Sequence, residues 1–304
     1  MAIVLASSFS QFMDEHIRVG LTSGFMEKAP DSGIFTFGNG ASVNVQTMTT
    51  SGYLNFSRTS ATQVAGNIST TSKSYTLQYQ RQVSLPFNIL DGEESGGVLT
   101  IENVVKTFMD QKAIPEIDAI RYSIIAGQAT TDGHSTEEDL TVANVMERIN
   151  ADFNAVLNRE GAMSNEQLVL YASYEVKGLM ESAMLDKSLI VTTSYDSILK
   201  TTVFLYNGVR IIFVPQSRFY TSVTLSNTGN GGYAKTAVIG RDLNYIVANV
   251  VNSTYGIIRN NDSKVVSPDT QAGSWNYTFD NVLYHDLFIP DEQVDGIQTS
   301  YKTI

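Results

Sequence analysis

Histidine is the residue type that most often carries acid–base or metal chemistry near neutral pH, and the chain has three: His16, His134 and His285. None has a second ligand at a metal-binding spacing such as H-x₃-H or H-E-x-x-H. The chain also lacks cysteine, which excludes disulfides, thiolate zinc sites and cysteine nucleophiles. We therefore expect no metal, no cofactor and no histidine-based catalytic site.

A glycine-rich stretch, GNGGYAKT at 229–236, has the look of a phosphate-binding loop. The P-loop pattern G-x-x-x-x-G-K-[ST] places glycine before the lysine, because the backbone there must approach the phosphates. Here Ala234 precedes Lys235, and polar loop sequence precedes the stretch. The residues indicate a glycine-rich loop and not a nucleotide site.

Two acidic pairs, Glu93–Glu94 and Glu137–Glu138, are candidates for paired catalytic carboxylates. Such a pair needs two different environments, so that one carboxyl stays protonated while the other ionises. Adjacent residues in a solvated turn or at a helix start lack that difference. Signatures of serine hydrolases and kinases are also missing from the sequence. We expect a protein that is not an enzyme.

Composition limits the partners of the chain. Of its 304 residues 42% are hydrophobic, enough for a core in two packed parts, and only 17% are charged, against about 25% in a typical soluble domain. The net charge of -11 comes without any basic cluster, which disfavours DNA binding through a basic patch. No stretch resembles a signal peptide or a membrane span. We expect assembly in the cytoplasm, and a sparsely charged surface suits packing against copies of the same chain.

The N-terminal part of the sequence predicts an arm, strands and a long polar connection. Residues 1–32 carry one amphipathic helix, with apolar residues at helical spacing: Phe9, Phe12, Met13, Ile17 and Leu21. This helix docks either on its own domain or on a neighbouring subunit. Residues 42–49 and 73–85 have strand patterns. The 50–72 segment between them has Arg58 as its only charge, and is either a surface loop or an extended hairpin ordered on another subunit.

The middle of the sequence predicts a long helix at 100–127, with Thr100 as its N-cap and Gly127 at its C-terminal end. Pro115 lies inside this helix and should kink or divide it, and the apolar stripe that continues across Pro115 favours one bent helix. Further elements follow in this order: a helix at 140–159, a buried strand at 167–172, a helix capped by Ser173, a strand at 209–214, a polar loop at 221–233, and strand-like runs from Tyr245 onwards. This order predicts the α+β class.

Two stretches resemble a known family. IPEIDAIRY at 114–122, and YHDLFI at 284–289 followed by DGI at 295–297, are similar to the P-E-x-D-x-x-R and Y-H-D-L-F…D-G-I patterns of tailed-bacteriophage major capsid proteins with the Hong Kong 97-like fold. The resemblance spans about 75–300, and the N-terminal third matches in layout. It implies five parts: an arm at 1–32, an extended loop at 33–88, a peripheral domain with a spine helix at 89–137, an axial domain at 138–244, and a return to the peripheral domain at 245–304.

The same resemblance implies a function. The chain would assemble into hexamers and pentamers that form the icosahedral head shell of a virion, made in the bacterial cytoplasm, without membrane contact. The shell would enclose double-stranded DNA without sequence-specific binding. A separate scaffolding protein, a portal and a decoration protein are the candidate partners besides the chain itself. Some members crosslink through a loop lysine, but Lys73 lies at the strand base, so we do not expect that chemistry here.

Candidate contacts between subunits are Tyr53, Phe56 and Arg58 in the loop, and Asp118 and Arg121 in the helix. Asp118 and Arg121 are three residues apart and would pair on one helix face, either as a surface pair or as a pair between subunits. Two other functions stay open: an encapsulin-like shell around a protein cargo, and a β-rich surface or adhesion protein.

Overall fold

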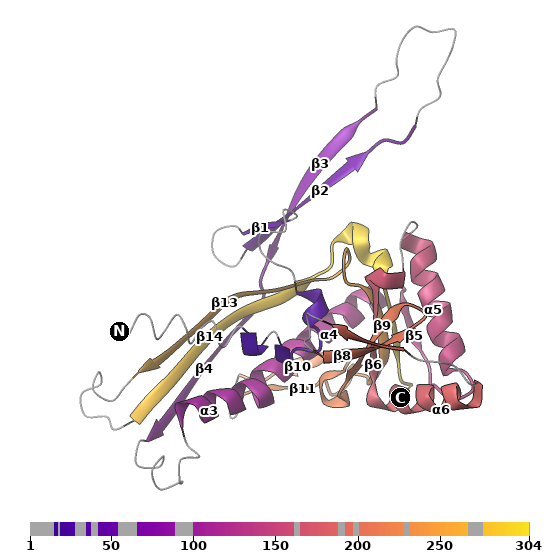
Figure 1. Cartoon of the computed structure of the whole chain (residues 1–304). Helices are drawn as coiled ribbons and strands as arrows, with labels where there is room; N and C mark the ends of the chain where they lie inside the picture. Colours follow the sequence, from indigo (N-terminus) through magenta and orange to yellow (C-terminus); the bar gives the residue numbers. More distant parts are fainter. Residues whose placement is uncertain are drawn as a thin grey trace.

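In the computed structural model, a β-hairpin projects from a body of mixed helices and sheets (Figure 1). The structure describes residues 15–17, 19–27, 35–37, 42–53, 66–88, 100–160, 165–187, 192–196, 201–227, 231–266 and 276–303. The strands of these residues form sheets of three, two, seven and three strands. The α+β class predicted from the sequence is confirmed.

The seven-stranded sheet forms the core of one part of the body. Its strands, in spatial order, are β5 (Ser135–Glu137), β15 (Ile297–Tyr301), β12 (Leu243–Asn249), β6 (Leu168–Ser173), β9 (Val209–Val214), β8 (Thr201–Tyr206) and β7 (Thr192–Asp196). Helices α5 (Val145–Glu160) and α6 (Tyr174–Lys187) pack on one face, and α4 (Ile114–Thr131) packs on the other. Successive side chains of β6 therefore enter opposite cores, which explains its uninterrupted apolar sequence. The predicted strands at 167–172 and 209–214 are confirmed.

The long predicted helix stays helical from Ile101 to Thr131, and a π-helical segment interrupts its regular geometry just before Pro115. Helix α3 (Ile101–Phe108) runs into a π-helical segment, η2 (Met109–Ala113), and then into α4, with Pro115 in its first turn. Proline fits there because a first-turn residue needs no intrahelical donor. The hydroxyl of Thr100 accepts from the backbone of Asn103 at 3.3 Å, so the predicted N-cap is confirmed.

The predicted C-terminal end of this helix at Gly127 is wrong. Helix α4 continues to Thr131, and Gly133, with φ at +74°, supplies the left-handed residue that ends it. The backbone N–H of His134 then donates to the carbonyl of Ala129 at 2.7 Å, which closes a Schellman-type end. Helix α5 also begins later than predicted, at Val145, whereas the predicted cap at Ser173 holds, with Val176 donating to its hydroxyl at 3.2 Å.

A three-stranded antiparallel sheet forms the second part of the body, in the order β13 (Tyr255–Val266), β14 (Asn276–Phe288) and β4 (Tyr79–Asn88). The strand predicted at 73–85 is in fact two strands: β3 (Ile68–Thr76) belongs to the hairpin and β4 to this sheet. The break falls at Leu77 and Gln78, where Leu77 is buried and the backbone of Gln78 donates to Asp286. The alternating pattern continues across the break, so the sequence carries no sign of it.

The hairpin sheet consists of β1 (Phe35–Phe37), β2 (Ser42–Thr50) and β3. Where a polar loop was predicted at 221–233, the structure has a small hairpin of β10 (Val223–Leu225) and β11 (Tyr233–Lys235). Short 3₁₀ turns complete the described elements: η1 (Gly24–Met26), η3 (Asn165–Gln167), η4 (Gln216–Arg218) and η6 (Asp291–Gly296). Within the described ranges, no helix combines the length and apolar character needed to cross a membrane.

The N-terminal segment docks on the body of its own chain. Residues 15–20 include a helical turn, in which the backbone N–H of Leu21 donates to the carbonyl of Ile17 at 3.0 Å. Ile17 and Leu21 are buried with residues of α3, α4 and β14. Phe9, Phe12 and Met13 lie outside the described residues. The predicted five-part division of the chain stays a prediction. Strand β15 lies within the predicted C-terminal part and β12 lies mostly within it, and the two strands pair in the seven-stranded sheet.

Candidate functional site

The projecting hairpin is the first candidate site. Strands β2 and β3 pair in continuous antiparallel register, from Ser42 opposite Thr76 to Thr50 opposite Ile68. Away from the body most of its side chains are exposed, including the large apolar residues Met48 and Ile68. A two-stranded ribbon has little stability by itself, and exposed apolar side chains of this kind are typical of a surface that contacts another molecule.

The base of the hairpin, in contrast, is fixed to the body. Val43 and Val45 of β2 are buried against a cluster from the three-stranded sheet: Tyr255, Ile257 and Phe288. The ring of Tyr75 lies 5.0 Å from that of Phe288, and Lys73 Nζ lies 2.6 Å from Asp291 Oδ2. The apolar contacts therefore set the direction in which the hairpin leaves the body, with an exposed ion pair beside them.

A buried polar cluster on α4 is the second candidate site, and Asp118 lies at its centre. The Asp118 carboxylate, 0% exposed, accepts hydrogen bonds from the backbone and hydroxyl groups of Thr22 and Ser23, at 2.7–3.1 Å. Arg218 Nη1 lies 3.1 Å from the same carboxylate. A buried carboxylate is tolerated only with such a full set of donors. Asp118 thus ties the N-terminal segment and η4 to the helix.

Arg121 holds the same N-terminal segment one turn further along α4. Its guanidinium, also 0% exposed, donates to Glu27 Oε2 at 2.5 Å and to the Ser23 hydroxyl at 3.2 Å. It lies against Gly256, where an added Cβ would be 2.9 Å from Arg121 Cζ, so no larger residue fits there without a shift. The expected surface pair of Asp118 with Arg121 is wrong, since both are buried and pair with other residues. The same burial disfavours their proposed contact with a second subunit.

A third ion pair, which the sequence did not suggest, lies near the start of α4. Arg81 of β4 contacts Glu116 with its Nε, at 2.5 Å, and reaches Asn227 Oδ1 at 2.9 Å. It thereby joins the three-stranded sheet, α4 and the connection between β10 and β11. No local pattern could indicate this contact, because Arg81 and Asn227 are 146 residues apart.

His285 and Asp286, at the end of β14, act in packing, as predicted. His285 is completely buried and stacks on Tyr79 with ring centroids 5.8 Å apart. Neither ring nitrogen finds a hydrogen-bond partner among the described residues. Burial, with the positive charges of Arg121 and Arg81, lowers the pKa of His285 to about 3, so the ring is neutral. Asp286 accepts from the backbone of Gln78 at 2.9 Å, while burial raises its pKa.

The remaining predicted contact residues lie on or beyond the described part of the hairpin. Tyr53 is fully exposed and lies three residues beyond the end of β2, whereas Phe56 and Arg58 lie outside the described residues. Within the described ranges, no three histidine or acidic side chains come together as a metal site would require. The described candidate sites are therefore a buried polar cluster on α4 and an exposed hairpin of β2 and β3.

Solved structures of phage proteins share the fold of this chain. The capsid chain of Myoviridae Phage XM1 matches with a TM-score of 0.55 at 11% identity, over 94% of this chain and 92% of that chain. A chain of Gordonia phage Cozz matches with 0.57 at 10%, over 86% and 81%. The mature capsid of bacteriophage PhiM1 matches with 0.52 at 13%, over 87% and 82%. No protein-family model and no curated protein matches the sequence. The chain therefore has the Hong Kong 97-like fold of phage capsid subunits.

Proposed function

We propose that the chain is the major capsid protein of a tailed bacteriophage. Hexamers and pentamers of it would form the icosahedral head shell around double-stranded DNA. The observation that carries the proposal is the fold itself, which matches the capsid chain of Myoviridae Phage XM1 over 94% of this chain and 92% of that chain. The exposed ribbon of β2 and β3 supports it, because an anchored, outward-reaching hairpin suits contacts that are repeated over a closed surface.

The remaining parts of the proposal follow from this role. A separate scaffolding protein, a portal and a decoration protein are the proposed partners, and assembly would take place in the host cytoplasm. The net charge of -11 suits a wall that encloses DNA without binding its phosphates.

Sedimentation and electron microscopy test the proposed function. Purified protein should sediment as uniform particles, and electron microscopy should show these particles to be hollow shells. Particles from infected cells should contain nuclease-protected DNA, whereas a protein cargo would indicate an encapsulin-like shell. A monomer under all conditions, with or without scaffold, would refute both.

Shortening the hairpin should separate folding from assembly. In the variant, residues 47–71 are replaced by Asn-Gly, a two-residue turn that joins the paired residues Gln46 and Ser72. The base cluster around Val43 and Val45 and the Lys73–Asp291 pair are retained. We expect an unchanged unfolding transition and no stable shells, measured by differential scanning calorimetry and sedimentation. Normal shells from this variant would contradict the role of the hairpin.

Tyr53→Ala tests one predicted contact without touching the fold. Because Tyr53 is fully exposed in the single chain, its removal should leave the unfolding temperature unchanged. If its ring is buried against another subunit, each contact should lose about 1–3 kcal/mol of binding free energy. The shells should then dissociate at a lower denaturant concentration. Gln80→Ala, at an exposed position of β4, is the matched control and should leave shell stability unchanged.

A further inference from the structure

A tight turn at 236–240 presents two apolar side chains to solvent. Val238 is 80% exposed and Ile239 is 67% exposed. The turn is closed by a hydrogen bond from the Gly240 N–H to the Thr236 carbonyl, at 3.0 Å. A Cβ on Gly240 would lie 2.5 Å from that carbonyl oxygen, so this closure requires glycine. The apolar tip is therefore held in a defined outward position.

The base of this turn is fixed as well. The Thr221 hydroxyl accepts from the backbone N–H of Arg241 at 2.8 Å, and the Thr221 N–H donates to the Arg241 carbonyl at 2.9 Å. Thr236 donates to the Ser222 carbonyl at 3.1 Å. A fixed apolar tip loses little conformational entropy when another surface covers it, which favours binding.

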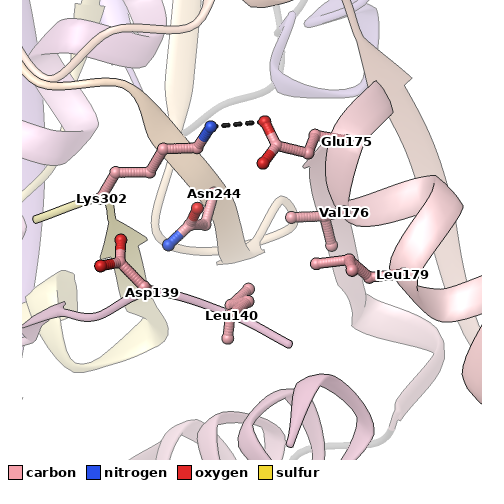
Figure 2. A pocket seen from close by; sticks show the side chains of 7 residues that line it. All are labelled: Asp139, Leu140, Glu175, Val176, Leu179, Asn244 and Lys302. Carbon is pink, nitrogen blue, oxygen red and sulfur yellow. Dashed lines mark hydrogen bonds and ion pairs between the residues drawn. The ribbon is translucent and has the colours of Figure 1, made fainter. Parts of the chain in front are cut away.

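A hollow of about 250 Å³ lies on the same part of the body, between α6, the segment before α5, β12 and the C-terminal residues. Figure 2 shows the ion pair of Lys302 with Glu175 above Asn244, Leu140 beside Asp139, and Val176 and Leu179 facing them from α6. Its lining thus mixes three apolar side chains with four polar or charged ones. Such a hollow accepts a small apolar knob with a complementary charge beside it.

The charges of the turn and of the hollow are complementary. Arg241 directly follows the turn, and among the described residues no carboxylate forms an ion pair with it. Asp139, at the rim of the hollow, is exposed and likewise has no cationic partner among the described side chains. Each subunit therefore offers an apolar tip beside a cation and a partly apolar hollow beside an anion, and neither charge is ion-paired among the described side chains. Two different complementary surfaces on one chain are what a head-to-tail contact between identical copies needs.

We propose that the 236–240 turn of one subunit inserts into the hollow of the next copy of this chain, with Arg241 of the first subunit paired to Asp139 of the second. Val238 and Ile239 would then cover Leu140 and Leu179. This inference rests on the proposed assembly of the chain into a shell, and it adds the partner and the residues of one contact. The contact joins the parts of neighbouring subunits that are built on the seven-stranded sheet.

Charge exchange tests the contact. Asp139→Arg and Arg241→Asp should each lower the yield of sedimenting shells about tenfold, because like charges then face each other at every copy of the contact. The double variant Asp139→Arg/Arg241→Asp should restore most of the yield, since the pair is re-formed with its signs exchanged. Val238→Asp/Ile239→Asp should abolish shells altogether. All variants should unfold at the wild-type temperature before assembly, because the changed side chains are not buried in the single chain.

Asp262→Arg is the matched control for Asp139→Arg. It makes the same charge change at an exposed position of β13, in the three-stranded sheet of β13, β14 and β4. Its shell yield should equal that of the wild type. Wild-type yields from both single charge variants, or a double variant no better than either single one, would overturn the proposed contact and leave the proposed shell function intact. Failure of the wild-type chain itself to assemble would instead count against the shell function.

Discussion

Asp118→Ala should lower the free energy of unfolding by about 3–5 kcal/mol, the range typical when one partner of a buried ion pair is removed. The substitution would leave Arg218 without its carboxylate, and the donors of Thr22 and Ser23 without their acceptor. Since these donors belong to the N-terminal segment, that segment should detach before the body unfolds. Urea denaturation of the unassembled chain measures the loss, and limited proteolysis within residues 15–27 measures the detachment.

Asp110→Ala is a suitable control for this prediction. Asp110 lies on η2, near the same N-terminal segment, and its carboxylate is 2.7 Å from His16 Nε2, but its side chain is 46% exposed. An exposed pair of this kind contributes at most about 1 kcal/mol. If both substitutions cost the same, the buried cluster would not be the anchor of the N-terminal segment.

The partners of Asp118 and Arg121 show where reasoning from the sequence fails. A spacing of three residues on a helix predicts that Asp118 and Arg121 pair with each other on the surface. In the structure their partners are Ser23, Glu27 and Arg218, between 94 and 100 residues away. The pairing depends on which elements pack on α4, and helical periodicity contains no information on that.

The elements that were predicted correctly are those with local causes. The π-helical irregularity next to Pro115 and the caps at Thr100 and Ser173 follow from the chemistry of single residues. The β6 strand follows from its uninterrupted apolar run. In contrast, the transfer of the chain from one sheet to another at Leu77 leaves the alternating pattern intact, and the hollow is lined by four separate segments. Features of this second kind emerge only from tertiary contacts.

The burial of His285 should make the chain sensitive to acid. The pKa of His285 is lowered to about 3 in the folded chain, whereas an unfolded chain takes up this proton near pH 6.5. Between these values the unfolded state binds the proton and the folded state does not, so stability falls as the pH falls below about 6.5. From pH 7 to pH 5 this one group should remove about 2 kcal/mol from the free energy of unfolding.

His285→Phe should remove this pH dependence, because phenylalanine keeps an aromatic ring against Tyr79 and does not titrate. Urea denaturation at pH 5 and pH 7 should give a difference about 2 kcal/mol smaller in the variant than in the wild type. His285→Gln should lose the same difference, yet be less stable at both pH values, since its buried amide needs hydrogen-bond partners that the site does not offer His285. Equal pH dependence in all three proteins would mean that the folded chain takes up the proton as readily as the unfolded one, and would contradict the closed packing of β14 against β4 around this ring.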